Sequence, residues 1–274
     1  MAFNERSVLR GVLLDIDGVL HVGMQPIPGA AETIDWLTHN GYAVQFITNT
    51  TTMSRSTLAR RLQQIGLPIE ERRLLTAPAA TAQYLRQHYP GKRVWMLTKG
   101  DTGSDFSAID LVDLQDTSAD VVVIGGAEEL LTYEAMNHAF RLLMDGAALL
   151  AMHTNLYWRT AAGLQLDSGP YVRALELATG KQAVVLGKPD RAFFEQALLS
   201  IGVSAREAVM VGDDIENDIA GAQLAGLSGI LVLSGKHRAD SPLLAKIHPD
   251  AILSSVAELP RYLDAQSGAA SKTS

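Results

Sequence analysis

Residues 12–20 read Val12-Leu13-Leu14-Asp15-Ile16-Asp17-Gly18-Val19-Leu20. An apolar run that ends at turn-forming residues is typical of a buried strand, so we expect a strand that ends in a loop. Asp15 and Asp17 would share one face of a regular strand, and Gly18 allows the backbone to leave that path. Open parallel sheets bind ligands at their carboxyl edge. Two carboxylates this close repel unless a cation or proton lies between them, so the segment predicts a metal site, an acid/base pair, or both.

The rest of the chain alternates between predicted strands and predicted helices. Apolar residues at helical spacing, ended by glycine or proline, predict helices over 30–40, 54–65, 79–88, 132–144, 171–179, 191–200, 217–225 and 256–263. Short apolar runs predict strands over 44–47, 74–76, 93–97, 120–124, 147–152, 208–211, 228–233 and 251–253. Residues 153–170 are expected to be irregular. Strands that alternate with helices indicate a parallel sheet.

The middle third repeats the strand–helix rhythm on a smaller scale. We therefore expect an α/β protein whose core is a doubly wound parallel sheet, with a smaller α/β unit inserted into it. The core is predicted to consist of residues 1–76 and 184–274, and the insert of residues 77–183.

The composition excludes several classes of protein. The 274 residues are 47% apolar and 19% charged, enough for a full core in one large or two ordinary domains. A net charge of −7 argues against a nucleic-acid partner. The chain has no cysteine, which excludes disulfides, thiolate metal sites and a cysteine nucleophile. We find no signal region and no apolar run long enough for a membrane span, so we expect a cytoplasmic protein without a membrane partner. Whether it forms a homo-oligomer stays open.

Polar residues follow four of the predicted strands or loops. They are Asp15 with Asp17, Thr48 with Asn49, Lys188, and Asp213 with Asp214 and Asp218. Because the carboxyl ends of parallel strands meet along one edge, we expect these clusters to converge. Carboxylate oxygens suit Mg²⁺, which keeps its other positions for water and substrate phosphate. Lysine, hydroxyl and amide donors suit a phosphate with charge on several oxygens.

The order of these motifs resembles the haloacid dehalogenase (HAD) superfamily of hydrolases. The resemblance rests on Asp15-Ile16-Asp17-Gly18-Val19, Thr48-Asn49, Gly187-Lys188-Pro189, and Gly212-Asp213-Asp214 with Asp218. An insert between the second and third motifs resembles class IIA, the NagD type with an α/β cap. Two further segments, residues 75–80 and Gly169-Pro170-Tyr171, resemble the phospholysine, phosphohistidine and inorganic pyrophosphate phosphatase branch. The similarity covers nearly the whole chain and implies a Mg²⁺-dependent phosphatase for small phosphorylated substrates.

The resemblance also implies roles for the matching residues. Asp15 would attack phosphorus and form an aspartyl-phosphate, and Asp17 would act as general acid and then general base. Mg²⁺ would be held by Asp15, the backbone carbonyl of Asp17, and Asp213.

The phosphoryl oxygens would be bound by the remaining motif residues, namely the Gly18 N–H, Thr48, Asn49 and Lys188. Asp218 would orient Lys188 or metal-bound water, and Asp214 would share one of these tasks.

Two alternatives remain open at the level of sequence. A dehalogenase or phosphonate hydrolase would use the same fold, although the resemblance gives a dehalogenase no need for Asp17 or Asp213. A non-enzymatic, phosphate-responsive binding module would also combine acids, threonine and lysine, although it would have no need for an insert of about a hundred residues. The seven histidines show no metal-ligand spacing, and we expect most of them at the surface or at helix ends.

Overall fold

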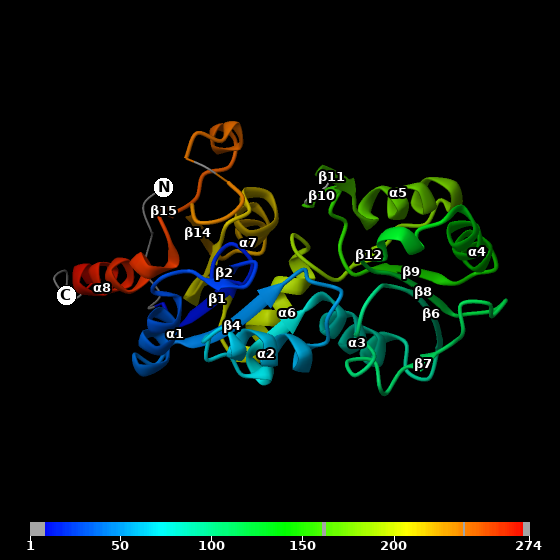
Figure 1. The fold of residues 1–274 in the computed structure, drawn as a ribbon, viewed down its shortest axis with the longest axis horizontal. Helices are drawn as coiled ribbons and strands as arrows, with labels where there is room; N and C mark the ends of the chain where they lie inside the picture. The colour runs from blue at the N-terminus through cyan, green and yellow to red at the C-terminus, as the bar shows by residue number, and fades with distance from the viewer. Residues whose placement is uncertain (1–8, 161–162, 238, 271–274) are drawn as a thin grey trace. The chain divides into compact units, whose positions relative to one another are not determined.

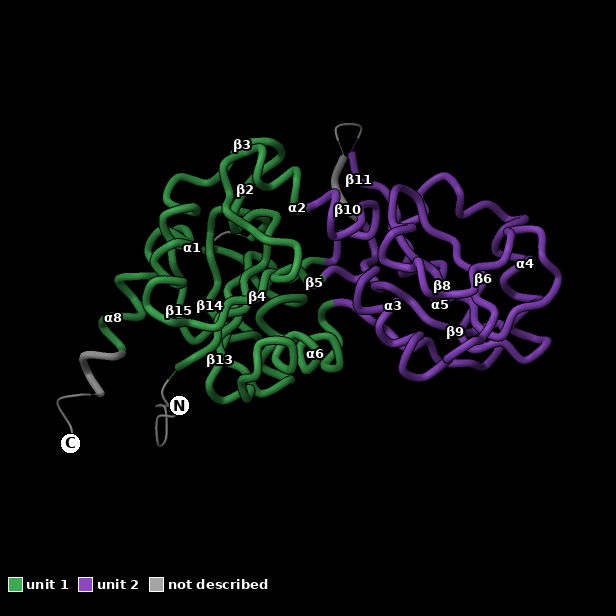
Figure 2. The backbone as a smooth tube through the Cα atoms, turned by 90° about the horizontal axis from the view of Figure 1, so that it is seen from below, with its two compact units in different colours: residues 1–48, 59–75, 188–274 green, residues 49–58, 76–187 purple. Residues whose placement is uncertain are grey.

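The structure is a computed structural model that describes residues 9–160, 163–237 and 239–270. The chain divides into two compact units, shown in separate colours in Figure 2. Unit 1 consists of residues 1–48, 59–75 and 188–274, and unit 2 of residues 49–58 and 76–187. Unit 2 therefore includes residues 49–58, 76 and 184–187, which lie outside the insert expected from the sequence.

Contacts within unit 2 explain why residues 49–58 belong to it. The Asp101 N–H donates to the Thr52 carbonyl oxygen at 3.2 Å. Arg55 pairs with the buried Asp105 at 2.9 Å, and its own N–H donates to the same carboxylate at 3.1 Å. These bonds join positions about fifty residues apart, and no local sequence pattern reports them.

Unit 1 is built on a six-stranded sheet with the order β15-β14-β13-β1-β4-β5; Figure 1 labels β1, β4, β14 and β15 of this sheet. The pairings that join β15 through to β4 are all parallel. The strands are β1 Gly11–Asp15, β4 Ala43–Thr48, β5 Leu74–Thr76, β13 Ala208–Gly212, β14 Ser228–Val232 and β15 Ala251–Leu253. β1 lies in the middle and is buried at all five positions. Its carboxyl end therefore lies at the centre of the sheet's edge.

Helices and one short hairpin complete unit 1. The helices are α1 Ala30–His39, α2 Arg55–Gln64 (which begins in unit 2), α6 Arg191–Ile201, α7 Gly221–Leu224 and α8 Leu259–Ala270. The hairpin pairs β2 His21–Val22 with β3 Gln25–Pro26. Local chemistry sets the limits of α6, because Asp190 accepts the Ala192 N–H at its start and Gly202, with φ 66°, ends it.

Unit 2 is built on a five-stranded sheet with the order β12-β9-β8-β6-β7, and all its pairings are parallel. The strands are β6 Arg93–Leu97, β7 Asp110–Leu111, β8 Val121–Ile124, β9 Ala148–Ala151 and β12 Val184–Val185. The helices are α3 Ala77–His88, α4 Tyr133–Met144 and α5 Ser168–Thr179. Side chains cap each helix at its start: Thr76 for α3, Thr132 for α4 and Asp167 for α5.

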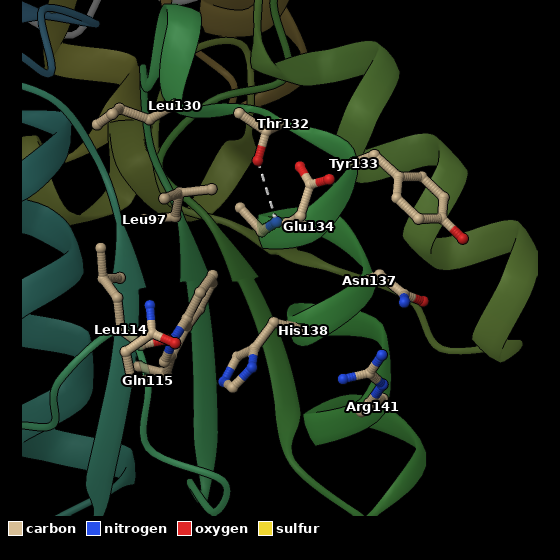
Figure 3. Close-up of a pocket in the computed structure, with 12 residues that line it drawn as sticks. Leu97, Leu114, Gln115, Leu130, Thr132, Tyr133, Glu134, Asn137, His138 and Arg141 are labelled. Atoms are coloured by element: carbon tan, nitrogen blue, oxygen red, sulfur yellow. Dashed lines mark hydrogen bonds between the residues drawn. The ribbon is translucent and has the colours of Figure 1, made fainter.

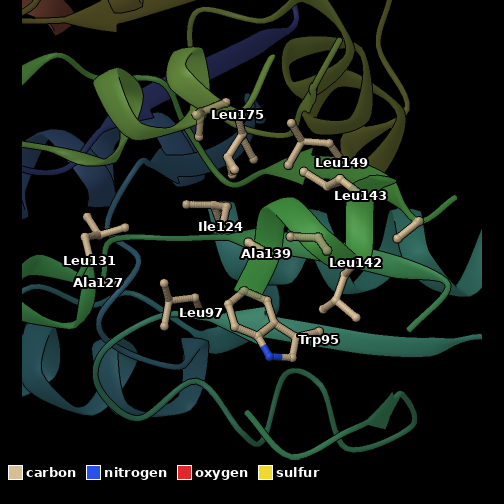
Figure 4. Close-up of a cluster of buried hydrophobic side chains, with 14 residues drawn as sticks. Trp95, Leu97, Ile124, Ala127, Leu131, Ala139, Leu142, Leu143, Leu149 and Leu175 are labelled. Atoms are coloured by element: carbon tan, nitrogen blue, oxygen red, sulfur yellow. The ribbon is translucent and has the colours of Figure 1, made fainter. Parts of the chain in front are cut away.

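Alternating side chains on the unit 2 sheet supply two separate apolar layers. Trp95 of β6 and Val122 of β8 pack with α4 and α5 on one face (Figure 4). Their neighbours Val94 and Val121 pack with α3 on the other face. A parallel sheet that is apolar on both faces needs helices on both faces. The predicted α/β class, with parallel sheets and helices, is confirmed.

One expectation about unit 2 is wrong. Residues 153–170 contain an antiparallel hairpin of β10 Tyr157–Thr160 and β11 Gly163–Leu166, together with the start of α5. Strands of four residues are too short to give a clear period, so the sequence pattern missed them. None of the helices in the described ranges is both long enough and apolar enough to cross a bilayer.

Candidate active site

The carboxyl edge of the unit 1 sheet holds a buried lysine between two buried carboxylates. β1 ends at Asp15, and the Lys188 Nζ lies 2.6 Å from its Oδ1. The same ammonium lies 2.6 Å from Asp218 Oδ1. The side chains of all three residues are less than a tenth exposed. One ammonium therefore pairs with two carboxylates that come from different ends of the sequence.

Asp218 also fixes the turn that carries Asp213. Its Oδ2 accepts the backbone N–H groups of Asp213 at 3.1 Å and Asp214 at 3.0 Å. The Asp218 side chain packs directly against the backbone of residue 212. That residue has to be glycine, because a Cβ there would overlap the Asp218 carboxylate. The Asp218 carboxylate is thus engaged at both oxygens, by two amides and by Lys188.

The helix expected over 217–225 takes a different form. A π-helical turn, Ile215–Ala220, precedes the short α7. The Asp214 carbonyl accepts from both Asp218 N–H and Ile219 N–H, at 2.9 Å and 3.2 Å, and so widens the turn. The Asp214 side chain accepts the N–H groups of Glu216 and Asn217 at its start. Such π turns occur frequently at functional sites, and this one holds Asp218 in place.

The cluster carries an excess of buried negative charge. Burial raises the pKa of Asp15 to about 7, although Lys188 acts against this, and the neighbouring Asp213 adds to the rise. Burial, with the nearby Asp218 charge, raises the pKa of Asp213 to about 6. Burial likewise raises the pKa of Asp218 to about 7, opposed by Lys188. Burial alone would lower the pKa of Lys188, but Asp15 and Asp218 outweigh it and raise that pKa.

This excess fits a bound divalent cation. Asp15, Asp213 and Asp218 each place one carboxylate oxygen within 4.8 Å of the others, the sole such group found among the residues that the structure describes. Buried carboxylate oxygens are the donors that Mg²⁺ prefers. Because Asp218 already binds Lys188 and two amides, Asp15 and Asp213 are the side chains best placed to act as ligands.

Asp17 is placed differently from the other acids. Its side chain is 65% exposed, and its Oδ1 lies 3.6 Å from Nε2 of the buried His21. The other ring nitrogen, Nδ1, donates to the Gly23 carbonyl oxygen at 3.0 Å. His21 is therefore a core histidine that supports the loop after β1. His21 and His153 are the two buried histidines among the described residues, so they are the exceptions to the expectation that most histidines lie at the surface or at helix ends.

Gly18 supports the cluster in a way that the sequence did not predict. Its backbone has φ 81°, and a Cβ at this position would overlap the Asp213 carboxylate. Its N–H donates to the His21 carbonyl oxygen at 2.8 Å, within its own turn. The expected phosphate contact of this amide is therefore corrected, because the amide is already engaged. Gly18 instead provides the space that Asp213 occupies.

Thr48 and Asn49 fall on either side of the division between the units. Thr48 is buried at the end of β4, beside β1 in the sheet. Asn49 belongs to unit 2, where its Oδ1 approaches Gly187 so closely that a Cβ at 187 would clash with it.

The sequence analysis missed the loop after β14. Ser234 Oγ donates to the Gly18 carbonyl oxygen at 2.7 Å. Lys236 donates to Asp213 through its backbone N–H and to Asp214 through its Nζ, both at 2.6 Å. A glycine–lysine pair after a strand resembles any surface turn, so no pattern in this single sequence marks these contacts.

Unit 2 carries a separate groove of about 560 Å³ (Figure 3). Trp95 is among the residues that line it, and its side chain donates to the Leu114 carbonyl oxygen at 3.1 Å and packs against the His138 ring. Glu134 and Arg141 line the groove as its charged side chains. The groove has a mixed apolar and polar lining, and it lacks the buried group of carboxylates found in unit 1.

Comparison with known proteins identifies the family. Residues 12–112 match the model described as haloacid dehalogenase-like hydrolase, and residues 185–259 match a second, HAD-hydrolase-like model. The human phospholysine phosphohistidine inorganic pyrophosphate phosphatase is 38% identical over 257 residues, covering 91% of this chain and 92% of that protein.

Solved structures agree with this result. The p-nitrophenyl phosphatase from Archaeoglobus fulgidus superposes with a TM-score of 0.86 at 27% identity, covering 93% of this chain and all of that one. NagD from Escherichia coli K-12 gives a TM-score of 0.79 at 27% identity, covering 92% and 98% of the two chains. The resemblance to NagD-type HAD hydrolases is confirmed. The chain belongs to the haloacid dehalogenase-like hydrolase family.

Proposed function

We propose that the chain is a Mg²⁺-dependent phosphatase that works through an aspartyl-phosphate on Asp15. The observation that carries this proposal is the buried Lys188 bridge between Asp15 and Asp218, next to Asp213. Phosphoryl transfer asks a protein mainly for positioning and for neutralisation of charge. This cluster offers a carboxylate nucleophile, an ammonium group and a set of oxygen ligands in one place.

The proposed reaction has two steps on this chain's own residues. An Asp15 oxygen attacks phosphorus, and the bond to the leaving group breaks while Asp17 donates a proton to the departing atom. Water then attacks the phosphorus of the aspartyl-phosphate and releases phosphate, while Asp17 takes up the proton of that water. The Asp17 side chain is 65% exposed, which supports this role because a departing group and water can reach its carboxyl.

Mg²⁺ would be held by Asp15, the Asp17 backbone carbonyl and Asp213. When bound, it would neutralise charge on the phosphoryl oxygens and keep Asp15 ionised. Thr48, Asn49 and Lys188 would bind the phosphoryl group, and Asp218 would hold Lys188 in place. Gly18 is not included among the phosphate donors, because its amide donates to His21.

The substrate proposed is a small phosphorylated compound. The relative's name includes phospholysine, phosphohistidine and inorganic pyrophosphate, so P–N bonds and pyrophosphate are the first substrates to compare with phosphate esters. We propose that unit 2 is the cap that selects among them, because the residues of the reaction itself lie mostly in unit 1.

The test is hydrolysis of 4-nitrophenyl phosphate by metal-free protein, with and without added Mg²⁺. We expect turnover only with the metal, and loss of turnover in Asp213→Asn. Turnover that is equal in chelator and in Mg²⁺ would contradict the proposed metal dependence. A panel of pyrophosphate, phosphohistidine, phospholysine and sugar phosphates, compared by kcat/KM, then ranks the substrate classes. Release of halide from a haloacid without Mg²⁺ would favour the dehalogenase alternative.

A further inference from the structure

Four consecutive residues after β14, Ser234–His237, contact both turns that carry the acids. They lie together in unit 1, in the loop that follows one strand beyond Asp213 in the sheet. Ser234 binds the Gly18 carbonyl oxygen at 2.7 Å. His237 Nδ1 lies 3.2 Å from the Asp213 carbonyl oxygen. The loop therefore ties the Asp15–Gly18 turn to the Asp213–Asp214 turn.

The middle of this loop encloses the Asp213 carboxylate. A Cβ on Gly18 or on Gly235 would overlap that carboxylate, so both backbones pack directly against it. The Lys236 N–H donates to Asp213 Oδ2 at 2.6 Å. This bond occupies Oδ2 and sets the orientation of the carboxylate group. The position of the other oxygen, Oδ1, is therefore fixed as well.

The side chain of Lys236 fixes the neighbouring acid. Its Nζ lies 2.6 Å from Asp214 Oδ2, which also accepts Asn217 Nδ2 at 3.0 Å. Asp214 Oδ1 accepts two backbone N–H groups of the π turn. Asp214 is thus fully engaged as an anchor, and Lys236 is the cation that balances its buried charge.

We propose that Lys236 is the positioning residue of the Mg²⁺ site, and that it raises Mg²⁺ affinity by holding Asp213 and Asp214 in one arrangement. The inference rests on the proposed Mg²⁺ site. Outer groups that orient a metal ligand typically change metal affinity by roughly 10- to 100-fold when removed. Electrostatics alone predicts the opposite result, because loss of a nearby ammonium would make a cation bind more tightly. The sign of the change therefore tests the inference.

The experiment is calorimetric titration of Mg²⁺ into metal-free, full-length protein without substrate. We compare the parent with Lys236→Met, which removes the ammonium, and with Lys236→Arg, which keeps a cation. Lys246→Met is the matched control, since Lys246 is exposed in the same unit. We expect the Mg²⁺ Kd to rise at least about tenfold in Lys236→Met, less in Lys236→Arg, and by less than about twofold in Lys246→Met.

Thermal midpoints of the metal-free proteins show that each variant is folded. If Lys236→Met is unfolded, Lys236→Arg and Lys236→Gln decide the question in its place. A Kd in the Lys236 variants that equals or falls below the parent value overturns the inference and leaves the proposed function intact. Absence of Mg²⁺ binding by the parent overturns the inference, and the phosphatase assay with and without Mg²⁺ then decides the proposed function separately.

Discussion

The two units share an architecture and differ at the carboxyl edge of their sheets. In unit 1, β1 ends at Asp15, and Asp213 follows β13 directly. In unit 2, Gly125 follows β8, Thr98 follows β6, and His153 lies two residues after β9. Both sheets contain several parallel strands. Buried carboxylates surround a lysine at the unit 1 edge, whereas glycine, a threonine hydroxyl and a histidine ring lie at the unit 2 edge.

The fold therefore provides the place for a site, and a few residues provide its chemistry. At the unit 2 edge, a Cβ on Gly125 would overlap Thr98 Oγ1, and a Cβ on Gly126 would overlap Thr51 Oγ1. The strand ends there are close-packed. His153 Nε2 lies 3.8 Å from Asp167 Oδ1, so the acid near this edge lies beside a histidine and not beside a lysine. A parallel sheet alone therefore does not bring buried carboxylates together.

The largest expected effect is on turnover. Asp15→Asn removes the proposed nucleophile, so we expect kcat to fall by at least roughly 1000-fold. In unit 2, Arg141→Met changes a charged residue of the groove and should keep turnover within a few-fold of the parent. Both are measured with 4-nitrophenyl phosphate and Mg²⁺. An inactive Arg141→Met that is folded, together with an active Asp15→Asn, would move the reaction to unit 2.

A second effect concerns stability. Lys188→Met leaves Asp15 and Asp218 buried without their cation, which should lower the free energy of unfolding by roughly 3–5 kcal/mol at pH 8. Lys99 of unit 2 pairs with Glu128 and Glu129 but is 40% exposed, so Lys99→Met should lower the free energy of unfolding far less than Lys188→Met does. Urea unfolding measures both variants. Equal losses would mean that the Lys188 bridge is no stronger than a surface pair.

The pH dependence of stability should have opposite signs at the two edges. The pKa values of Asp15 and Asp218, each raised to about 7 by burial, mean that the folded chain binds more protons than the unfolded chain between about pH 4 and 7. Their contribution to metal-free stability therefore falls as pH rises through this range. Burial lowers the pKa of His153 below its usual value, so its contribution rises with pH up to about 6.5.

Thermal midpoints in chelator at pH 5 and pH 7 check these signs. We expect Asp15→Asn to reduce the loss of stability between the two pH values, and His153→Gln to increase it. Added Mg²⁺ should reduce the loss in the parent, because it favours ionised carboxylates. Metal-free stability that is the same at pH 5 and pH 7 in all three proteins would contradict this prediction. It would show that burial does not raise the pKa values of Asp15 and Asp218.

The smallest effect is expected from the hydroxyl at the unit 2 edge. Thr98 Oγ1 is buried and has no hydrogen-bond partner among the described residues. Replacing it with a methyl group of similar shape should be neutral or should stabilise the fold by up to about 1 kcal/mol. Thr98→Val is compared with the parent by urea unfolding. A loss of more than about 1 kcal/mol would show that this hydroxyl has a partner that matters.

Sequence reasoning was effective where position along a strand determines position in space. Asp15, Lys188, Asp213 and Asp218 are separated by up to two hundred residues, yet strand ends and motif order placed them at one edge, and the structure has them in contact. The α/β class followed from the alternation of apolar runs and helical periods.

Sequence reasoning failed where backbone groups or distant side chains make the contact. Lys236 binds Asp213 through its N–H, a group that every residue except proline has. The Gly18 amide was expected to face phosphate, but its turn closes on His21. The Arg55–Asp105 pair drew residues 49–58 into unit 2 across fifty positions. None of these follows from periodicity or from turn composition.

The most direct test of the central claim is to trap the aspartyl-phosphate. Protein is mixed with 4-nitrophenyl phosphate and Mg²⁺, quenched in acid and treated with borohydride, which reduces an acyl phosphate to an alcohol. Peptide mass spectrometry then examines residues 11–20. We predict homoserine at position 15, dependent on Mg²⁺ and absent from Asp15→Asn. Full turnover with an unmodified Asp15 in every quenched sample, or with the label on another residue, would contradict the assignment of the nucleophile.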